Sequence, residues 1–177
     1  MEFEIEYLAE HVDAIPTLAR WHHDEWASTT PELTVADRAN RIRARARTGG
    51  VPTGFVAVVD HEVVGLACLV ECDLESHAHL TPWLATVLVA PNYRGRGIGS
   101  TLCRRVTEEA RAFGFAHAYL FTLDKQDLYR RLGWSNVEQA NWRGHQVTIM
   151  ENDLAGSART GPDGAPSVSR RGSVQRR

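Results

Sequence analysis

The sequence predicts a mixed α/β fold (α+β), with a mostly antiparallel central sheet of about seven strands flanked by about four helices. Three observations lead to this prediction. The chain has 177 residues, of which 43% are hydrophobic and 24% charged, as expected for one globular domain. Apolar patterns of period two and of helical period follow one another in the order β-α-α-β-β-β-α-β-α-β-β. Tight turns between several strands require antiparallel pairing.

The N-terminal part is predicted to hold one strand and two helices. Residues 3–8 alternate apolar and polar side chains, which is typical of a strand. Asp13 is expected to cap a helix that runs to about residue 26. A second helix is expected after Thr34, because Asp37 three residues later completes a pattern related to the capping box. Gly49-Gly50 would end it.

The second helix is rich in arginine, and most of these residues lie off its apolar stripe. We expect them to form a solvated basic face, with contact to a phosphate or to a partner as the alternative. The residues are Arg38, Arg41, Arg43, Arg45 and Arg47.

The middle of the chain is predicted to contain three consecutive strands. Residues 55–59 and 63–70 are β-branched and apolar, and Asp60-His61 joins them in a tight hairpin. A polar loop over residues 71–82 leads to a third strand at 83–89. An amphipathic helix follows and ends at Gly114.

The C-terminal part adds strands on the other side of that helix. Residues 116–121 form a strand that must run parallel to 83–89, because a helix connects the two. A short helix covers about 125–132. The segments 137–142 and 146–150 form a hairpin that turns at Arg143-Gly144.

The composition changes after Leu154. Residues 155–177 contain almost no large apolar side chains, so we expect a domain over 1–154 and a basic, disordered tail over 155–177. The whole chain has a formal charge of −2, and most of the basic excess lies in the tail. The acidic body argues against nucleic acid as the main partner and favours a cationic substrate.

Neither a signal peptide nor a membrane span is visible in the sequence. The three cysteines, Cys68, Cys72 and Cys103, are interpreted as free thiols in a reducing compartment. Cysteine and histidine spacings do not indicate a zinc site. These features predict a cytoplasmic protein without a metal and without a membrane partner.

The stretch from Val87 to Ser100 has the pattern of a strand, a glycine-rich turn and a helix N-terminus. Glycine lets a ligand approach the backbone, and successive N–H groups with the helix dipole attract an anion. Arg94 and Arg96 add full positive charges. The turn lacks the Lys-Ser/Thr end of a P-loop, and its glycines do not fit the dinucleotide-binding pattern. The sequence therefore predicts a pyrophosphate site.

This turn resembles a known signature. Arg94, Gly97 and Gly99 fill an Arg/Gln-x-x-Gly-x-Gly/Ala pattern, preceded by Pro91 and Tyr93. The pattern is similar to the acetyl-CoA-binding motif of the GNAT N-acetyltransferase superfamily. A second segment, Leu-Tyr-Arg-Arg-Leu-Gly-Trp at 128–134, resembles another family motif, and the order of elements matches over about 150 residues.

The resemblance implies an acyltransferase that moves the acetyl group of acetyl-CoA to a primary amine of a small molecule or of a peptide N-terminus. In this family the amine attacks directly and a tetrahedral intermediate forms, whose oxyanion is held by a backbone amide of the fourth strand. The residues implied in cofactor binding are Val87, Leu88, Val89, Arg94, Gly95, Arg96, Gly97, Ile98, Gly99 and Ser100.

Tyr129 aligns with the family tyrosine that acts as general acid toward the leaving thiolate, and a phenol has a suitable pKa for this role. Packing under the sheet is the alternative interpretation. The general base is open, because Trp83 stands where many relatives carry a glutamate. The nearby candidates are a water relay or one of Glu71, Asp73, Glu75, His77 and His79.

The acceptor side of the reaction is less defined by the sequence. His22 to Trp26 ends the first helix, which borders the acceptor site in this fold, and a surface helix end is the alternative. Trp83 and Trp142 could line the same site or the core. A non-catalytic acyl-CoA sensor and a toxin-like acetyltransferase of aminoacyl-tRNA are alternative functions. Homodimers occur in the family, so a homodimer is one candidate assembly.

Overall fold

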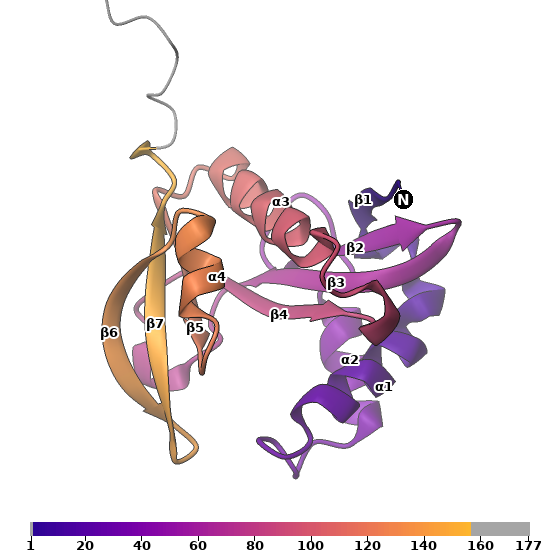
Figure 1. The fold of residues 1–177 in the computed structure, drawn as a ribbon, viewed down its shortest axis with the longest axis horizontal. Coiled ribbons are helices and arrows are strands. Elements are labelled where there is room, and N and C mark those ends of the chain that lie inside the picture. The colour runs from indigo at the N-terminus through magenta and orange to yellow at the C-terminus, as the bar shows by residue number, and fades with distance from the viewer. Residues whose placement is uncertain (1, 157–177) are drawn as a thin grey trace, which may run out of the picture.

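The computed structural model describes residues 2–156 and shows one seven-stranded sheet with helices on both faces (Figure 1). The strand order is β1-β2-β3-β4-β5-β7-β6. The strands are β1 (Glu4–Tyr7), β2 (Thr53–Val59), β3 (Glu62–Val70), β4 (Trp83–Val89), β5 (His117–Thr122), β6 (Ser135–Trp142) and β7 (His145–Asp153). The helices are α1 (Ile15–Trp26), α2 (Val35–Ala44), α3 (Ile98–Ala112) and α4 (Gln126–Arg131). Short 3₁₀ turns are η1 (Leu8–Glu10), η2 (Val12–Ala14), η3 (Glu75–His77) and η4 (Pro91–Tyr93).

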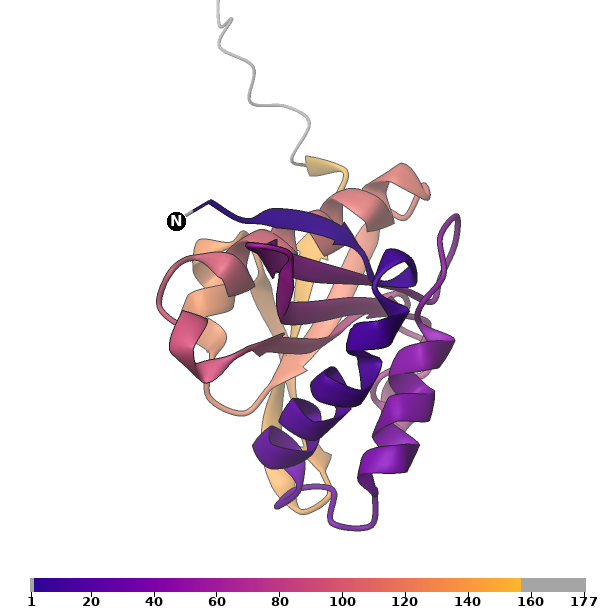
Figure 2. The same ribbon diagram turned by 90° about the vertical axis from the view of Figure 1, so that its right-hand side faces the viewer.

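The sheet separates two hydrophobic cores. Helix α3 buries Leu102 and Val106 against one face, where α4 also packs. Helices α1 and α2 bury Leu18 and Ile42 against the opposite face, and Figure 2 shows these two helices side by side across the sheet. The predicted fold class, a mostly antiparallel sheet with about four helices, is confirmed. We call the two sides the α3 face and the α1/α2 face.

The sheet splits at its only parallel pair. Strands β4 and β5 share one register position, Trp83 opposite Tyr119, and then diverge, so that β5, β7 and β6 run across the direction of β4 (Figure 1). On its other edge, β4 pairs with β3, but Thr86 and Val87 together oppose Ala67 in a β-bulge. The backbone at Thr86 has φ of +55°. The bulge therefore lies where the sheet opens.

The predicted hairpin turns are confirmed. Asp60 and His61 both have positive φ, as a two-residue turn of the primed type requires, and Arg143-Gly144 repeats this at the β6–β7 turn. Strand β7 is longer than predicted and reaches Asp153, because its residues from Thr148 to Asp153 pair with the whole of β5. Tertiary pairing thus extends the strand beyond its apolar sequence pattern.

The two N-terminal helices begin differently. Helix α2 has a complete capping box, in which the Thr34 hydroxyl accepts from the Asp37 amide and the Asp37 carboxylate accepts from the Thr34 amide. The prediction that Asp13 caps α1 is wrong, because Asp13 lies inside the turn η2 and Ala14 precedes α1 without a side-chain cap. Pro16 instead occupies the first turn, where it needs no hydrogen-bond partner.

The prediction of a fully solvated arginine face on α2 is wrong for Arg38. Only 1% of its surface is exposed. Its guanidinium donates to the carbonyl and hydroxyl of Thr30 and to Nδ1 of His22. The buried donors are thereby largely satisfied, which lowers the cost of burying this charge.

Within residues 2–156, none of the helices is long and apolar enough to span a membrane. The three cysteines are free thiols, as predicted. The predicted tail falls outside the described residues from position 157 onward.

Candidate active site

The glycine-rich turn leads directly into α3. Gly95 and Gly97 have φ of +75° and +84°, a conformation that side chains rarely adopt, and Gly97 is the N-cap of α3. A Cβ built on either glycine would meet no atom within 4 Å. The first N–H groups of α3 have no partner within the helix and point toward this open space. The turn can therefore admit an anion against bare backbone, which fits a pyrophosphate group.

Two arginines frame this turn in different ways. Arg94 donates from Nε to the carbonyl of Val89 and forms an ion pair with Glu25 at 2.7 Å. This pair links the turn to the C-terminal end of α1. The Arg96 guanidinium lies 5.7 Å from the ring centre of Tyr93. Both guanidinium groups border the turn, as the spacing in the sequence suggested.

The other predicted cofactor residues lie around the start of α3. Val87 and Val89 point toward Gly99, whose Cβ would lie 3.6 Å from a methyl of Val89. Leu88 faces the opposite way and is buried in the α1/α2 core, and Ile98 is buried under α3. Gly99 and Ser100 remain partly accessible. The sheet thus brings the α3 face of β4 and the helix N-terminus together.

Tyr129 lies on α4 and faces the α3 core, where its ring meets Trp134 edge-on with centroids 6.3 Å apart. Burial and the neighbouring Cys103 raise the pKa of the Tyr129 phenol. Its hydroxyl has no hydrogen-bond partner among residues 2–156. A phenol that stays protonated over the whole physiological range can donate a proton to a stronger base.

On the α1/α2 face, Arg45 contacts the bulge of β4. Its Nη1 donates to the Thr86 hydroxyl at 2.7 Å, across 41 positions of sequence. The Arg45 charge also reaches the buried thiol of Cys68 on β3, where it offsets part of the rise in pKa that burial causes. The guanidinium therefore sits on the bulge, at the opening between β4 and β5.

Of the five predicted base candidates, Asp73 is the one that is brought near the bulge. Burial raises the pKa of its carboxyl, and the charges of Arg45 and Arg41 offset part of that rise. A carboxylate with a raised pKa is a better proton acceptor than an ordinary aspartate.

The other four candidates are placed differently. Glu71, Glu75 and His79 are exposed, and His77 faces Glu138 of β6 at 3.4 Å. Among the five candidates, Asp73 therefore differs from the others in lying close to Arg45 and the bulge.

Sequence reasoning did not single out Arg45 or Thr86. The helical spacing from Arg38 to Arg45 shows that both lie on one side of α2. A bulge at Thr86 leaves no signal in the apolar run of β4, because β-branched residues suit a regular strand equally well.

Trp83 belongs to the core, as one of its two predicted interpretations held. It is fully buried, and its indole N–H donates to the carbonyl of Leu80. Its ring lies 6.0 Å from that of Tyr119. Phe121 and Trp142 continue this aromatic group on the α1/α2 face, with centroids 5.2 Å apart.

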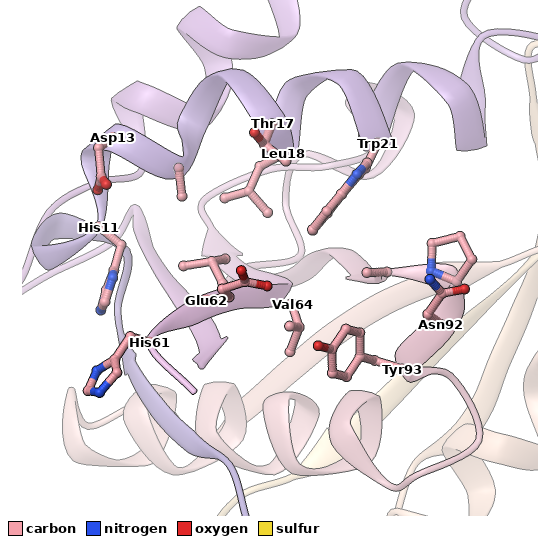
Figure 3. Close-up of a pocket in the computed structure, with 14 residues that line it drawn as sticks. His11, Asp13, Thr17, Leu18, Trp21, His61, Glu62, Val64, Asn92 and Tyr93 are labelled. Carbon is pink, nitrogen blue, oxygen red and sulfur yellow. The ribbon is translucent and has the colours of Figure 1, made fainter. Parts of the chain in front are cut away.

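A separate cavity of about 570 Å³ lies between α1, the start of β3 and η4 (Figure 3). Asp13 and Trp21 from α1 and its preceding turn, Glu62 from β3 and Tyr93 from η4 line it. None of Thr86, Tyr129 or the glycines of the turn contributes to it. The cavity is therefore distinct from the candidate active site. Among residues 2–156, no group of three or more His, Cys, Asp or Glu side chains could hold a metal ion.

Solved structures share this fold. An N-acetyltransferase from Staphylococcus aureus Mu50 superposes with a TM-score of 0.66 at 19% identity, over 87% of this chain and 99% of the other. The yncA protein of Salmonella typhimurium, solved with its cofactor acetyl-CoA, gives 0.65 at 17% identity over 96% and 100%. A ribosomal-protein-alanine N-acetyltransferase from Brucella melitensis gives 0.65 at 21% identity over 86% and 99%. No curated protein matches the sequence.

A split sheet with a glycine turn after its fourth strand is thus a fold that this chain shares with solved acetyltransferase structures. The sequence profile of the acetyltransferase (GNAT) family matches residues 15–134. The chain belongs to this family and is an acyltransferase whose acyl donor is acetyl-CoA.

Proposed function

We propose that this enzyme acetylates a primary amine of a small molecule or of a peptide N-terminus by direct attack on the thioester of acetyl-CoA. One observation supports this proposal above all others. The bulge at Thr86 lies where the sheet opens, with Tyr129 on the α3 face and the Arg45–Asp73 pair on the α1/α2 face. A donor and an acceptor could therefore meet at the bulge from opposite faces of the sheet.

The donor side of the proposal uses the turn and β4. The amides of Gly95–Ser100, with Arg94 and Arg96, would hold the pyrophosphate, and the backbone at Val87–Val89 would align the rest of the molecule. Bound acetyl-CoA supplies an activated acetyl group and a thiolate leaving group. An amide at the bulge lies outside the regular pairing of β3 and β4, so it is the proposed oxyanion donor.

The proton transfers are assigned to two residues. Asp73 accepts a proton from the ammonium form of the acceptor, directly or through a water, and frees the nitrogen lone pair. The nitrogen would then add to the acetyl carbon, with the bulge amide holding the oxyanion, and its second proton would be lost to solvent. The carbon–sulfur bond would break in the next step. Tyr129 donates its proton to the thiolate and regains one from solvent. The raised pKa of Asp73 suits its role, because the carboxylate binds a proton more readily than usual. Burial keeps Tyr129 protonated until the thiolate departs, although it also makes the phenol a weaker acid.

The proposal also includes the cellular location of the enzyme and the number of chains that it needs. We place the enzyme in the cytoplasm, since Cys68, Cys72 and Cys103 are free thiols in the structure. The proposal needs only one chain, because its residues come from the strands, helices and connecting loops around one sheet.

The test is release of free coenzyme A from acetyl-CoA with a panel of amines and peptides. Turnover with at least one amine is expected, and Tyr129→Phe should reduce it by roughly 10²–10⁴-fold while acetyl-CoA affinity is kept. Equal turnover of the variant would remove Tyr129 from the chemistry. Binding of acetyl-CoA without turnover of any amine would contradict the proposed reaction.

A further inference from the structure

We propose that the acceptor amine carries a carboxylate, and that Arg41 and Arg45 of α2 bind this carboxylate beside the bulge of β4. The acceptor is then a small amino acid rather than a polyamine or another purely cationic amine. This inference rests on the proposed function and names its substrate class.

Three arginines occupy one side of α2. Arg38 and Arg41 lie within α2 and Arg45 is its C-cap with helical backbone angles, so spacings of three and four place the three on neighbouring positions of one helix side. They differ in exposure: Arg38 is buried, Arg45 is half-buried and Arg41 is exposed. The exposure of the three guanidinium groups on this side of α2 therefore increases from Arg38 through Arg45 to Arg41.

The contact of Arg45 shows where these three arginines lie relative to the proposed site of acetyl transfer. Its contact with the Thr86 hydroxyl puts the guanidinium on the bulge, on the α1/α2 face. Arg41 is close enough to Asp73 and to His22 that its charge lowers the pKa of both groups. The two guanidinium groups and the proposed base therefore lie near one another.

These positive charges are not matched by the groups around them. Within residues 2–156, no carboxylate lies within ion-pair distance of Arg41 or Arg45. Glu32, whose pKa is lowered by a hydrogen bond from its own backbone and also by the charge of Arg41, is bound by Arg143 of the β6–β7 turn at 2.6 Å. Asp37 accepts from the amide and hydroxyl of Thr34, and these hydrogen bonds and the charge of Arg41 lower its pKa. His22 is neutral near pH 7, because burial and the arginines lower its pKa to about 4. The carboxylates of Asp73, Asp37 and Glu32 are therefore outnumbered by the guanidinium groups of Arg38, Arg41, Arg45 and Arg143.

A carboxylate on the acceptor would satisfy this excess. A guanidinium presents five N–H donors in a plane that matches the two oxygens of a carboxylate, and the Thr86 hydroxyl engages only one of the Arg45 donors. The ammonium group of the same molecule would face Asp73. The apolar surface of Phe121 and Trp142 on this sheet face suits an uncharged side chain.

The phosphates of coenzyme A are an unsuitable match for these arginines. The glycine turn lies at the N-terminus of α3 on the other face, and its own arginines are Arg94 and Arg96. Arg45 contacts β4 at Thr86, well before the strand ends at Val89. The α2 arginines are therefore closer to the expected thioester than to the phosphates.

The experiment compares each amino acid with its own amide, for example L-methionine with L-methioninamide and L-phenylalanine with L-phenylalaninamide. Wild-type enzyme should prefer the acid by at least ~10-fold in kcat/KM, because charge-assisted hydrogen bonds discriminate by about that factor or more. Arg41→Gln should reduce the ratio mainly through KM, and Arg41→Glu should reverse it in favour of the amide. Arg45→Lys, which keeps the charge, should retain part of the preference.

Arg43→Gln is the matched control, because Arg43 is exposed on the same helix and bonds only the side chain of Asn40. Its ratio should equal that of wild type. Equal rates for acids and amides in wild type, or a loss of acetyl-CoA affinity instead of acceptor discrimination in Arg41→Gln, would overturn the inference while leaving the acetyltransferase proposal intact.

A binding measurement separates the two proposals if no amine is turned over. The thermal stability of the enzyme with saturating coenzyme A should rise with L-methionine or L-phenylalanine and not with the amides. The same rise must disappear in Arg41→Glu. Absence of any difference between acids and amides in this assay contradicts the carboxylate site, whatever the outcome for turnover.

Discussion

Arg38 is the most buried charged side chain among residues 2–156, and it has no carboxylate partner there. Its guanidinium is held by neutral acceptors, and one of them is Nδ1 of His22. Because a guanidinium only donates, His22 must accept at Nδ1 and carry its proton on Nε2. The arginine therefore selects the tautomer and the neutral state of this histidine.

The neutral His22 makes a prediction for stability against pH. Its pKa falls from the ordinary 6.5 to about 4 in the folded chain. Between pH 6.5 and pH 4, His22 is protonated in the unfolded chain but stays neutral in the folded chain. The free energy of unfolding therefore decreases as the pH falls from neutral toward 4. Linkage gives a loss of about 3 kcal/mol from this residue alone.

Urea unfolding at pH 7 and pH 4 measures this loss. His22→Asn, whose amide oxygen can still accept from Arg38, should show a smaller decrease in unfolding free energy than wild type. His61→Asn changes an exposed histidine and should follow wild type. An unchanged pH dependence in His22→Asn would mean that another group titrates.

Asp73 yields a prediction for catalysis against pH. A base must be deprotonated to act, so activity should rise with pH through the pKa of Asp73, which burial places above that of an ordinary aspartate. Asp73→Asn should lower kcat by roughly 10²–10⁴-fold and abolish the acidic limb of the profile, with acetyl-CoA binding kept. If Glu71→Gln removes the limb and Asp73→Asn does not, the base is misassigned.

At the scale of elements, the N-terminus of α3 combines backbone conformation with charge. Gly97 caps the helix in the left-handed region, so its amide and those that follow face outward. The helix dipole adds positive potential at the same place. Neither effect depends on a particular side chain at Gly97, so a substitution can separate strain from charge.

Gly97→Ala and Gly97→Glu make this separation. Both variants strain the backbone by about 1–2 kcal/mol, because each adds a Cβ at positive φ. Only the glutamate also places a negative charge in the proposed pyrophosphate site. Acetyl-CoA affinity, measured by calorimetry, should therefore fall at least ~10-fold further in Gly97→Glu than in Gly97→Ala. Equal affinities of the two variants would show that the turn does not bind the phosphates.

The bulge of β4 is the second element with a functional consequence. It displaces Thr86 and Val87 from the β3 ladder at the point where β5 has already turned away. Thr86 has a positive φ, and its hydroxyl accepts the hydrogen bond from Arg45. In a regular strand, the backbone groups of residues 86 and 87 would be part of the β3–β4 pairing and would not be available at the opening.

At the scale of the whole molecule, the sheet divides the work between its faces. The α3 face carries the turn and Tyr129, and the α1/α2 face carries Arg45 and Asp73. Two ion pairs reach across elements far apart in sequence: Arg94 with Glu25, and Arg143 with Glu32. The first pair connects the C-terminal end of α1 to the glycine turn before α3. The second pair connects the loop after α1 to the β6–β7 turn.

We propose that the folded domain ends just after β7. Leu154 is buried, its amide donates to the carbonyl of Ala116, and its carbonyl accepts from Nε of Arg111. Truncation after Gly156 should therefore leave the melting temperature and the KM for acetyl-CoA unchanged. Truncation after Asp153 removes the Leu154 side chain from the core, which typically costs about 2–5 kcal/mol, and should lower the melting temperature. A lower melting temperature already in the longer variant would contradict this boundary.

Much of the fold follows from local patterns. The capping box at Thr34, the turn at Asp60-His61 and the glycine turn before α3 are short-range features, and each has the predicted conformation. The Asp13 prediction was wrong because Asp13 lies inside the turn η2, two positions before α1 begins at Ile15, and Pro16 in the first turn of α1 has no N–H that needs a partner. The expectation of a cationic substrate, drawn from the net charge of the chain, stays a prediction, because the acceptor amine is not identified by the fold.

The sequence by itself determined the order of elements, the turn at Arg94–Ser100 and the family to which they belong, because these are properties of neighbouring residues. Only the tertiary structure decided that Arg38 is buried, that Arg45 reaches Thr86 and that Asp73 stands apart from the other acids of its loop. These facts depend on contacts between α2, β4 and the loop after β3. Such contacts form when the cores pack, and burial then sets the charge state of each group.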